Sequence, residues 1–266
     1  MLCYNHLEEN VRGMTIRPHR GIFKTIIKML KDIGYNVSWS ILRTQDHGMS
    51  HSRARLYIVG IRNDSQRHEF VWPKPVPLKR TAKQLLLRDP QADRRLRLPL
   101  SPKHKALVKN AYRTAMANGH DPRRAAIITD IGCSPRFACH GVGQMPCMTA
   151  TRCQQMGFWI SVVGRKVNLL ELFQFQGIDH DVAEDIMETI TASQRQLKKI
   201  ITDAKVGHML GNTMSLNVIE RVLLKALPAA GLALAKNLVD RWDPCVTATS
   251  SGLDGVSLQL ILLRQS

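Results

Sequence analysis

Arg53 and Arg55 lie two residues apart in a segment, 53–60, whose apolar residues favour a buried strand. Because alternate residues of a strand point to the same face, both guanidinium groups are expected on one side of the sheet. A guanidinium forms paired hydrogen bonds with carbonyl or phosphate oxygens. The spacing therefore predicts a face that could bind a carbonyl and a phosphate, and the alternative is an ordinary solvated strand face.

Two other short segments carry side chains suited to chemistry. Glu8 and Glu9 are adjacent carboxylates, and a carboxyl group can exchange a proton with a weakly basic ring nitrogen. Taken alone, such a pair is more typical of an exposed surface. Gly211 and Asn212 precede an apolar stretch, and a plain turn is one interpretation of them.

The cysteines indicate reduced thiols in an intracellular protein, because they form no CxxC pair and a chain of 266 residues needs no covalent staples. There are six: Cys3, Cys133, Cys139, Cys147, Cys153 and Cys245. A zinc site from Cys133, Cys139, His140 and Cys147 is a minor alternative, since their spacings match no common zinc pattern. We therefore expect no metal.

The charge balance points to a polyanionic partner. There are 38 Lys and Arg against 21 Asp and Glu, a net charge of +17. Because bound phosphates release counterions, such a protein favours nucleic acid. The N-terminus has no signal-peptide layout, and no apolar run reaches the ~18 residues of a membrane span. We expect a soluble protein without a membrane partner.

The positioning elements alternate between helix and strand. A helix is expected over 22–33, a strand over 35–42 and a buried strand ending at Gly60, which together indicate an α/β fold. Segment 64–160 is rich in proline and predicts a separate irregular domain. It contains a basic belt: Lys79, Arg80, Lys83, Arg88, Arg94, Arg95, Arg97, Lys103, Lys105 and Lys109. Helices are expected over 168–176, 181–201 and up to Pro228.

Four segments, the third of them in two parts, resemble in order and spacing the later motifs of the DNA (cytosine-5) methyltransferase family. Glu9–Val11 is similar to its ENV motif, and His51–Gly60 to its QxRxR strand. Met145–Ala150 resembles the end of the target-recognition region, and Gly164–Gly177 the helix that follows it. Gly211–Val218 is similar to the closing GN motif.

The resemblance implies a role for each matching residue. Glu9 would contact the ring nitrogen of a flipped cytosine and raise its electrophilicity, with Glu8 as the rival for this role. Arg55 would be catalytic at the base, and Arg53 would support it. Thr149 and Arg165 would contact DNA, although Arg165 could instead stiffen the hinge between domains. A further implication is that Asn212 and Thr213 line the S-adenosylmethionine site.

The chain departs from the family pattern in several places. His51 replaces a glutamine, and the segment 168–171 lacks the family's arginine. The FxGxG cofactor turn and the Pro-Cys nucleophile loop should precede Glu9, where only eight residues stand. Pro146-Cys147 and Pro244-Cys245 resemble that loop but follow the RxR strand, so we do not expect either cysteine to be the nucleophile.

The resemblance thus implies a partial Rossmann-like methyltransferase sheet with an inserted basic target-recognition domain. The expected domains are 1–63 (catalytic), 64–160 (recognition), 161–228 (return to the catalytic domain) and an unassigned tail, 229–266. We expect a truncated or split cytosine-5 methyltransferase that uses S-adenosylmethionine and double-stranded DNA, with an N-terminal half supplied in trans.

Two rival functions stay open at this point. One is a catalytically inactive remnant that only binds DNA through the basic belt. The other, weaker one is an unrelated RNA-binding protein, which the low aromatic content of 5% disfavours because base stacking needs aromatic side chains. Location would be intracellular: the nucleus in a eukaryote, otherwise the cytoplasm.

Overall fold

The computed structural model describes residues 5–87, 96–97, 100–197 and 200–243. The chain divides into two compact units. Unit 1 comprises Met1–Gly48, Ala54–Lys79 and Leu216–Ser266, and unit 2 comprises Met49–Arg53 and Arg80–Ser215. The boundaries differ from those expected at residues 63 and 160. Residues 49–53 belong to unit 2, unit 1 continues as far as residue 79, and the helices between 161 and 215 belong to unit 2.

The sheet of unit 1 has three strands in the order β1-β4-β2. They are β1 (His6–Val11), β2 (Tyr35–Arg43) and β4 (Ala54–Arg62). Since β4 pairs antiparallel with both neighbours, β1 and β2 run parallel to each other. They are joined through η1 (Arg12–Thr15) and α1 (Arg20–Asp32). The predicted α/β class and the helix and strands of residues 22–60 are confirmed.

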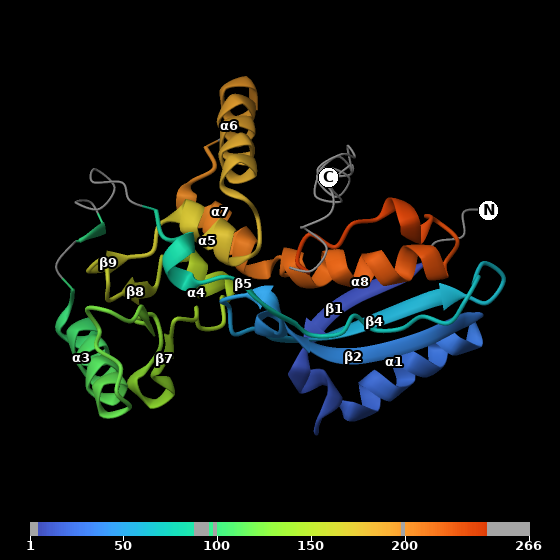
Figure 1. The fold of residues 1–266 in the computed structure, drawn as a ribbon, viewed down its shortest axis with the longest axis horizontal. Helices are drawn as coiled ribbons and strands as arrows, with labels where there is room; N and C mark the ends of the chain where they lie inside the picture. The colour runs from blue at the N-terminus through green and yellow to red at the C-terminus, as the bar shows by residue number, and fades with distance from the viewer. Residues whose placement is uncertain (1–4, 88–95, 98–99, 198–199, 244–266) are drawn as a thin grey trace. The chain divides into compact units, whose positions relative to one another are not determined.

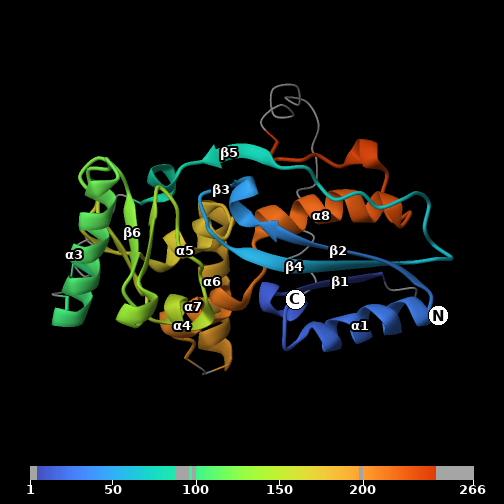
Figure 2. The same cartoon turned by 90° about the horizontal axis from the view of Figure 1, so that it is seen from below.

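Alternating side chains of β4 build a separate core on each face of this sheet. Leu56 and Ile58 pack with Phe23 of α1 on one face. Tyr57, Val59 and Ile61 pack against Val218 and Val222 of α8 (Leu216–Ala229) on the other. Figures 1 and 2 show α1 and α8 on opposite sides of the sheet. The two-residue period of β4 thus explains why both helices are needed.

The segment after α8 is built into unit 1 as far as residue 243. It includes η5 (Ala235–Asn237), and the Trp242 side chain is 1% exposed. The Trp242 indole N–H donates to Glu220 (2.6 Å), and Arg241 pairs with the same carboxylate (2.8 Å) while lying over the indole ring. Residues 240–243 therefore cover α8. The predicted tail beyond residue 243 lies outside the described residues.

His47 lies in a buried polar cluster of unit 1. It is the first residue of β3 (His47–Met49), which pairs with β5 (Val76–Arg80) in a two-stranded sheet. Its Nδ1 is 2.6 Å from the guanidinium of Arg221, which also pairs with Asp240 at 2.8 Å. Asn217 donates to the carbonyl of His47 at 2.8 Å. Burial, and secondly the charge of Arg221, lower the pKa of His47 to about 4. The folded state therefore holds this imidazole neutral.

Unit 1 is expected to lose stability as the pH falls from about 6.5 to about 4. In this window the unfolded chain protonates His47 and the folded chain does not, so acid favours unfolding. A difference of about 2.5 between the two pKa values corresponds to about 3 kcal/mol. Urea unfolding at pH 7.5 and 4.5 measures it. His47→Gln should flatten this dependence of stability on pH, and His68→Gln, which changes an exposed histidine, should not. The prediction would be contradicted if His47→Gln left the dependence intact and His68→Gln removed it.

Unit 2 contains a four-stranded antiparallel sheet in the order β7-β6-β8-β9. Its strands are β6 (Ile127–Asp130), β7 (Cys139–Val142), β8 (Phe158–Ile160) and β9 (Arg165–Lys166). The helical elements are η3 (Ala82–Leu85), α3 (Pro102–Ala117), η4 (Pro135–Phe137), α4 (Ala150–Gln154), α5 (Leu169–Phe175), α6 (His180–Leu197) and α7 (Asp203–Asn212). The unit is more regular than its prolines suggest. The sequence pattern did not reveal this sheet, because its strands are too short for alternation to be visible.

Helix α7 packs closely on α4 through two glycines one turn apart. A Cβ at Gly207 would lie 2.5 Å from the carbonyl oxygen of Cys153. A Cβ at Gly211 would lie 2.5 Å from backbone atoms of Thr149 and Ala150. The turn interpretation of Gly211 and Asn212 is wrong, since they are the last two residues of α7.

Gly211→Ala is expected to destabilise unit 2 by about 1–3 kcal/mol, because backbone atoms must move to admit the methyl group. Gly21→Ala in α1 is the matched control. Nothing lies within 4 Å of a Cβ at Gly21, so alanine should be neutral or stabilising there. Urea unfolding followed by circular dichroism compares the two. Equal midpoints for both variants would show that α7 does not need this close approach.

Candidate active site

Glu9 and Arg55 form a nearly buried ion pair in unit 1. The Arg55 Nε lies 3.0 Å from a Glu9 carboxylate oxygen, and the two side chains are 16% and 8% exposed. Register places Glu9 opposite Tyr57 and Arg55 opposite Val11, so the pair is diagonal across β1 and β4. The Arg55 guanidinium also donates to the carbonyl of Ala54 at 2.9 Å. A carboxylate and a guanidinium from two motifs thus share one surface.

Glu8 points to the other face of β1, as the alternation of a strand requires. It contacts its own strand neighbours, with His6 Nε2 at 3.4 Å and the Asn10 amide at 3.2 Å. Its side chain is 33% exposed. Geometry therefore favours Glu9 over Glu8 as the carboxylate that works with Arg55.

Arg53 precedes β4 and belongs to unit 2, where its residue is 3% exposed. Its guanidinium donates to the carbonyl of Met148 (2.8 Å). It also donates to those of Gly211 (3.3 Å) and Thr213 (3.0 Å). The structure therefore places Arg53 and Arg55, only two residues apart, in different environments. The guanidinium of Arg53 connects the end of α7 with the segment before α4.

The residues around Arg53 hold the same segment by backbone contacts. Met145 and Ser50–Ser52 exchange two hydrogen bonds of 2.8 Å, and a His51 ring nitrogen accepts from the Met148 N–H at 3.3 Å. Thr149 follows at the N-terminus of α4 and is exposed. Residues 50–53 and 145–148 therefore form a rigid support, which we call the clasp, directly before the predicted DNA-contacting threonine.

Arg165 is 0% exposed and forms a paired salt bridge with Glu171, with N–O distances of 2.7 and 2.8 Å. It also donates to the carbonyls of Leu87 and Lys166. Glu171 in turn accepts from the Asn168 and Leu87 N–H groups. A phosphate contact needs an accessible guanidinium, which this burial does not provide, and the partners of Arg165 all lie in unit 2.

Asn212 and Thr213 differ in what they offer a cofactor. Asn212 is exposed, and its side chain makes no hydrogen bond to another described residue, so its amide is open to a ligand. The Thr213 hydroxyl donates to the Leu210 carbonyl (2.7 Å) and accepts from Gln176 (3.1 Å). Asn212 therefore fits a polar ligand directly, whereas Thr213 fits a role in orienting it.

Three of the four cysteines within the described residues do not resemble an activated nucleophile. Burial raises the pKa of Cys153 to about 12. Burial is also the main reason why the pKa values of Cys133 and Cys139 are raised. Cys147 lies between residues of the clasp. Cys3 and Cys245 lie outside the described residues. In the described ranges no group of three or more His, Cys, Asp or Glu could hold a metal ion.

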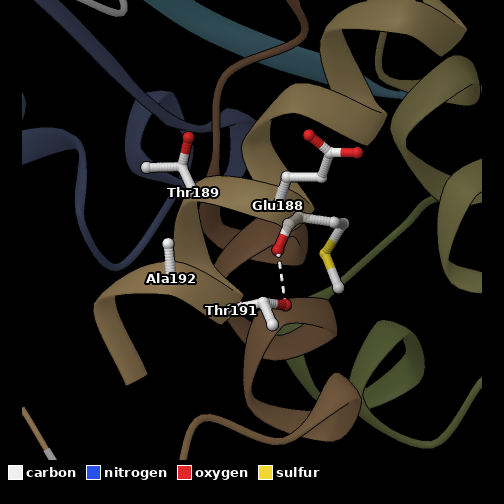
Figure 3. A pocket seen from close by; sticks show the side chains of 5 residues that line it. Glu188, Thr189, Thr191 and Ala192 are labelled. Atoms are coloured by element: carbon white, nitrogen blue, oxygen red, sulfur yellow. Dashed lines mark hydrogen bonds between the residues drawn. The ribbon is translucent and has the colours of Figure 1, made fainter. Parts of the chain in front are cut away.

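Figure 3 shows a hollow on α6, lined by Met187, Glu188, Thr189, Thr191 and Ala192. Thr191 donates to the carbonyl of Met187 in its own helix, and among the described lining residues Glu188 alone is charged. No second charged residue lines this hollow in the part of the chain that the structure describes. We therefore place the candidate active site at Glu9 and Arg55.

None of the described helices has the length and apolar character of a membrane span.

Comparison with known protein families gives a match over most of the chain. The profile of the family described as "C-5 cytosine-specific DNA methylase" matches residues 7–227. The chain belongs to this family. The match includes Glu9, Arg53, Arg55, Thr149, Arg165, Asn212 and Thr213. It ends before Trp242, whose contacts are therefore a feature beyond the family match.

Individual relatives match over short stretches. The type II methyltransferase M.MthTI of Methanothermobacter thermautotrophicus is 39% identical over 80 residues, 30% of this chain and 24% of the relative. M.Bsp6I of a Bacillus species is 34% identical over 79 residues, 29% and 25% respectively. The chain thus matches about a quarter of the length of these relatives.

Among solved structures, an Entamoeba histolytica methyltransferase is similar at 15% identity, with a TM-score of 0.49. The likeness covers 84% of this chain and 62% of that one. At this distance the superposition adds nothing to the assignment.

Two sets of contacts that support these residues could not be found from the motifs of the chain. Glu171 is the partner of Arg165, and the spacing Asn168-x-x-Glu171 is a capping-box signal that indicates its place at the start of α5. The clasp had no such signal, because its contacts join residues about 95 positions apart. Only the fold brings them together.

Proposed function

We propose that this chain is the part of a DNA cytosine-5 methyltransferase that holds the target base and the DNA. The reaction would transfer a methyl group from S-adenosylmethionine to carbon 5 of cytosine in double-stranded DNA. A segment in trans would supply the thiolate nucleophile. The observation that carries the proposal is the nearly buried Glu9–Arg55 pair in a chain of the cytosine-5 methylase family.

The pair suits the electronic demand of the reaction. Cytosine carbon 6 is a poor electrophile until its ring nitrogen accepts a proton or a strong hydrogen bond. Glu9 would provide that contact to a base flipped out of the duplex. Arg55 would orient the Glu9 carboxylate and donate to the base carbonyl. The ion pair keeps both groups in place before the base arrives.

Single residues are proposed to contact the cofactor and the DNA. S-adenosylmethionine supplies the methyl group when bound, and the open amide of Asn212 would help to hold it. Thr213, fixed by Gln176, would orient the chain next to that amide. Thr149, which is exposed, would contact a DNA phosphate through its hydroxyl.

A DNA-binding protein without catalysis is the second candidate. It is favoured by the raised pKa values of Cys133, Cys139 and Cys153 and by the fixed surroundings of Cys147. In that case the +17 net charge would serve DNA binding alone.

A methyl-transfer assay separates the two candidates. The chain, an N-terminal half that carries FxGxG and Pro-Cys motifs, and their mixture are each incubated with radiolabelled S-adenosylmethionine and duplex DNA. We expect methylated cytosine only from the mixture. Duplex binding by the chain without methylation in any arm would support the inactive remnant, and no binding to duplex DNA would refute both.

A further inference from the structure

Helix α3 carries a cationic face with no acidic residue on the helix. Its sixteen residues include Lys103, Lys105, Lys109 and Arg113 and neither Asp nor Glu. Lys105, Lys109 and Arg113 are exposed and follow one another at intervals of four, so they lie along one side of the helix. None of these three forms an ion pair with a residue that the structure describes. Their charge is uncompensated in the described part of the unit.

The same side of α3 is hollowed between these stems. The hollow has a volume of about 520 Å³, and it is lined by the three cationic residues together with Val108, Tyr112 and Met116. Its walls are mostly apolar, as the methylene stems of lysine and arginine provide when their charged ends point outward. The charges therefore edge the hollow and can move toward a large anionic surface.

The helix is held rigidly beneath this face. Ala111 and Ala115 pack with Ile127 of β6 on the buried side. The Tyr112 hydroxyl accepts a hydrogen bond from the Trp159 indole at 2.9 Å. The three cations are thus presented from a fixed support, which limits the entropy lost when they bind a ligand.

We propose that Lys105, Lys109 and Arg113 on α3 bind the phosphate backbone of double-stranded DNA. Four residues of helix advance about 6 Å, so the three charges extend over about 12 Å. One DNA strand presents a phosphate about every 3.4 Å along its axis. The row therefore matches a continuous line of phosphates, whereas one small anion could contact only part of it. This inference rests on the proposed function, because it specifies how the DNA is held.

The test measures duplex affinity of the full chain against salt. The variant Lys105→Gln/Lys109→Gln/Arg113→Gln is compared with Lys24→Gln/Lys28→Gln/Lys31→Gln, which removes three exposed lysines from one side of α1 in unit 1. Fluorescence anisotropy with a 30-base-pair duplex gives the dissociation constant between 50 and 200 mM NaCl. Circular dichroism checks that both variants keep the helical content of the parent.

We expect the α3 variant to reduce the slope of log K against log salt by about 3, and the α1 variant to change it little. Single α3 variants should each reduce it by about 1. An unchanged slope in the α3 variant, or equal losses in the two triple variants, would overturn the inference. If the parent chain and its N-terminal half methylate DNA but the α3 slope is unchanged, only this inference falls. A parent chain that binds no duplex overturns the proposed function as well.

Discussion

Glu9→Gln is expected to lower methyl transfer by the chain and its N-terminal half about 10²- to 10⁴-fold, the usual contribution of a general acid or base. Glutamine keeps the shape of the side chain but cannot share a proton with the ring nitrogen, and it removes the charge that holds Arg55. The rate of transfer from radiolabelled S-adenosylmethionine measures the effect, and duplex affinity should change far less.

Glu8→Gln is the matched control, because it changes the adjacent residue in the same way on the opposite face of β1. Its rate should stay within about threefold of the parent, since surface substitutions usually have small effects. If Glu8→Gln lost the activity and Glu9→Gln kept it, the Glu9–Arg55 pair could not be the active site. Equal losses in both variants would also count against the assignment.

Glu171→Leu is expected to destabilise unit 2 by about 3–5 kcal/mol. The change leaves the Arg165 guanidinium buried without its carboxylate, and breaking a buried pair on one side has this magnitude. The Leu87 and Asn168 N–H groups also lose their acceptor. Urea unfolding followed by circular dichroism should show a lower midpoint.

Two comparisons define this prediction. Arg165→Met/Glu171→Leu should recover part of the loss, because no unpaired charge remains while the Leu87 and Asn168 groups stay unsatisfied. Asp64→Asn removes the carboxylate of the exposed Arg62–Asp64 pair and should leave the midpoint close to that of the parent. A Glu171→Leu variant as stable as Asp64→Asn would show that the buried pair contributes nothing.

The sequence predicted the elements with clear periodicity and the residue pair that they position. Helix α1 and strands β2 and β4 follow from spacing that their own packing enforces, since each faces a core on one side or both. Glu9 and Arg55 lie together because a motif at the end of β1 and a motif at the start of β4 are neighbours in one sheet.

Other features depended on contacts that sequence spacing does not encode. The alternation rule placed Arg53 beside Arg55, but β4 begins at Ala54, so the rule no longer applies one residue earlier. The strands of unit 2 have two to four residues, which is too few to show a period. The clasp and the packing of α7 on α4 join distant segments through backbone atoms, whose positions side-chain types do not reveal.

The hydrogen bond between Glu220 and Trp242, beside the ion pair of Glu220 with Arg241, makes each of these two side chains depend on the other. Glu220 is 3% exposed, and both its described hydrogen bonds come from residues beyond the stretch 7–227 that the family model matches. A homologue that lost this tryptophan would leave the Glu220 carboxylate with one described donor fewer, the Arg241 guanidinium alone. We therefore expect homologues to keep or to lose the acidic residue at position 220 and the tryptophan at position 242 together.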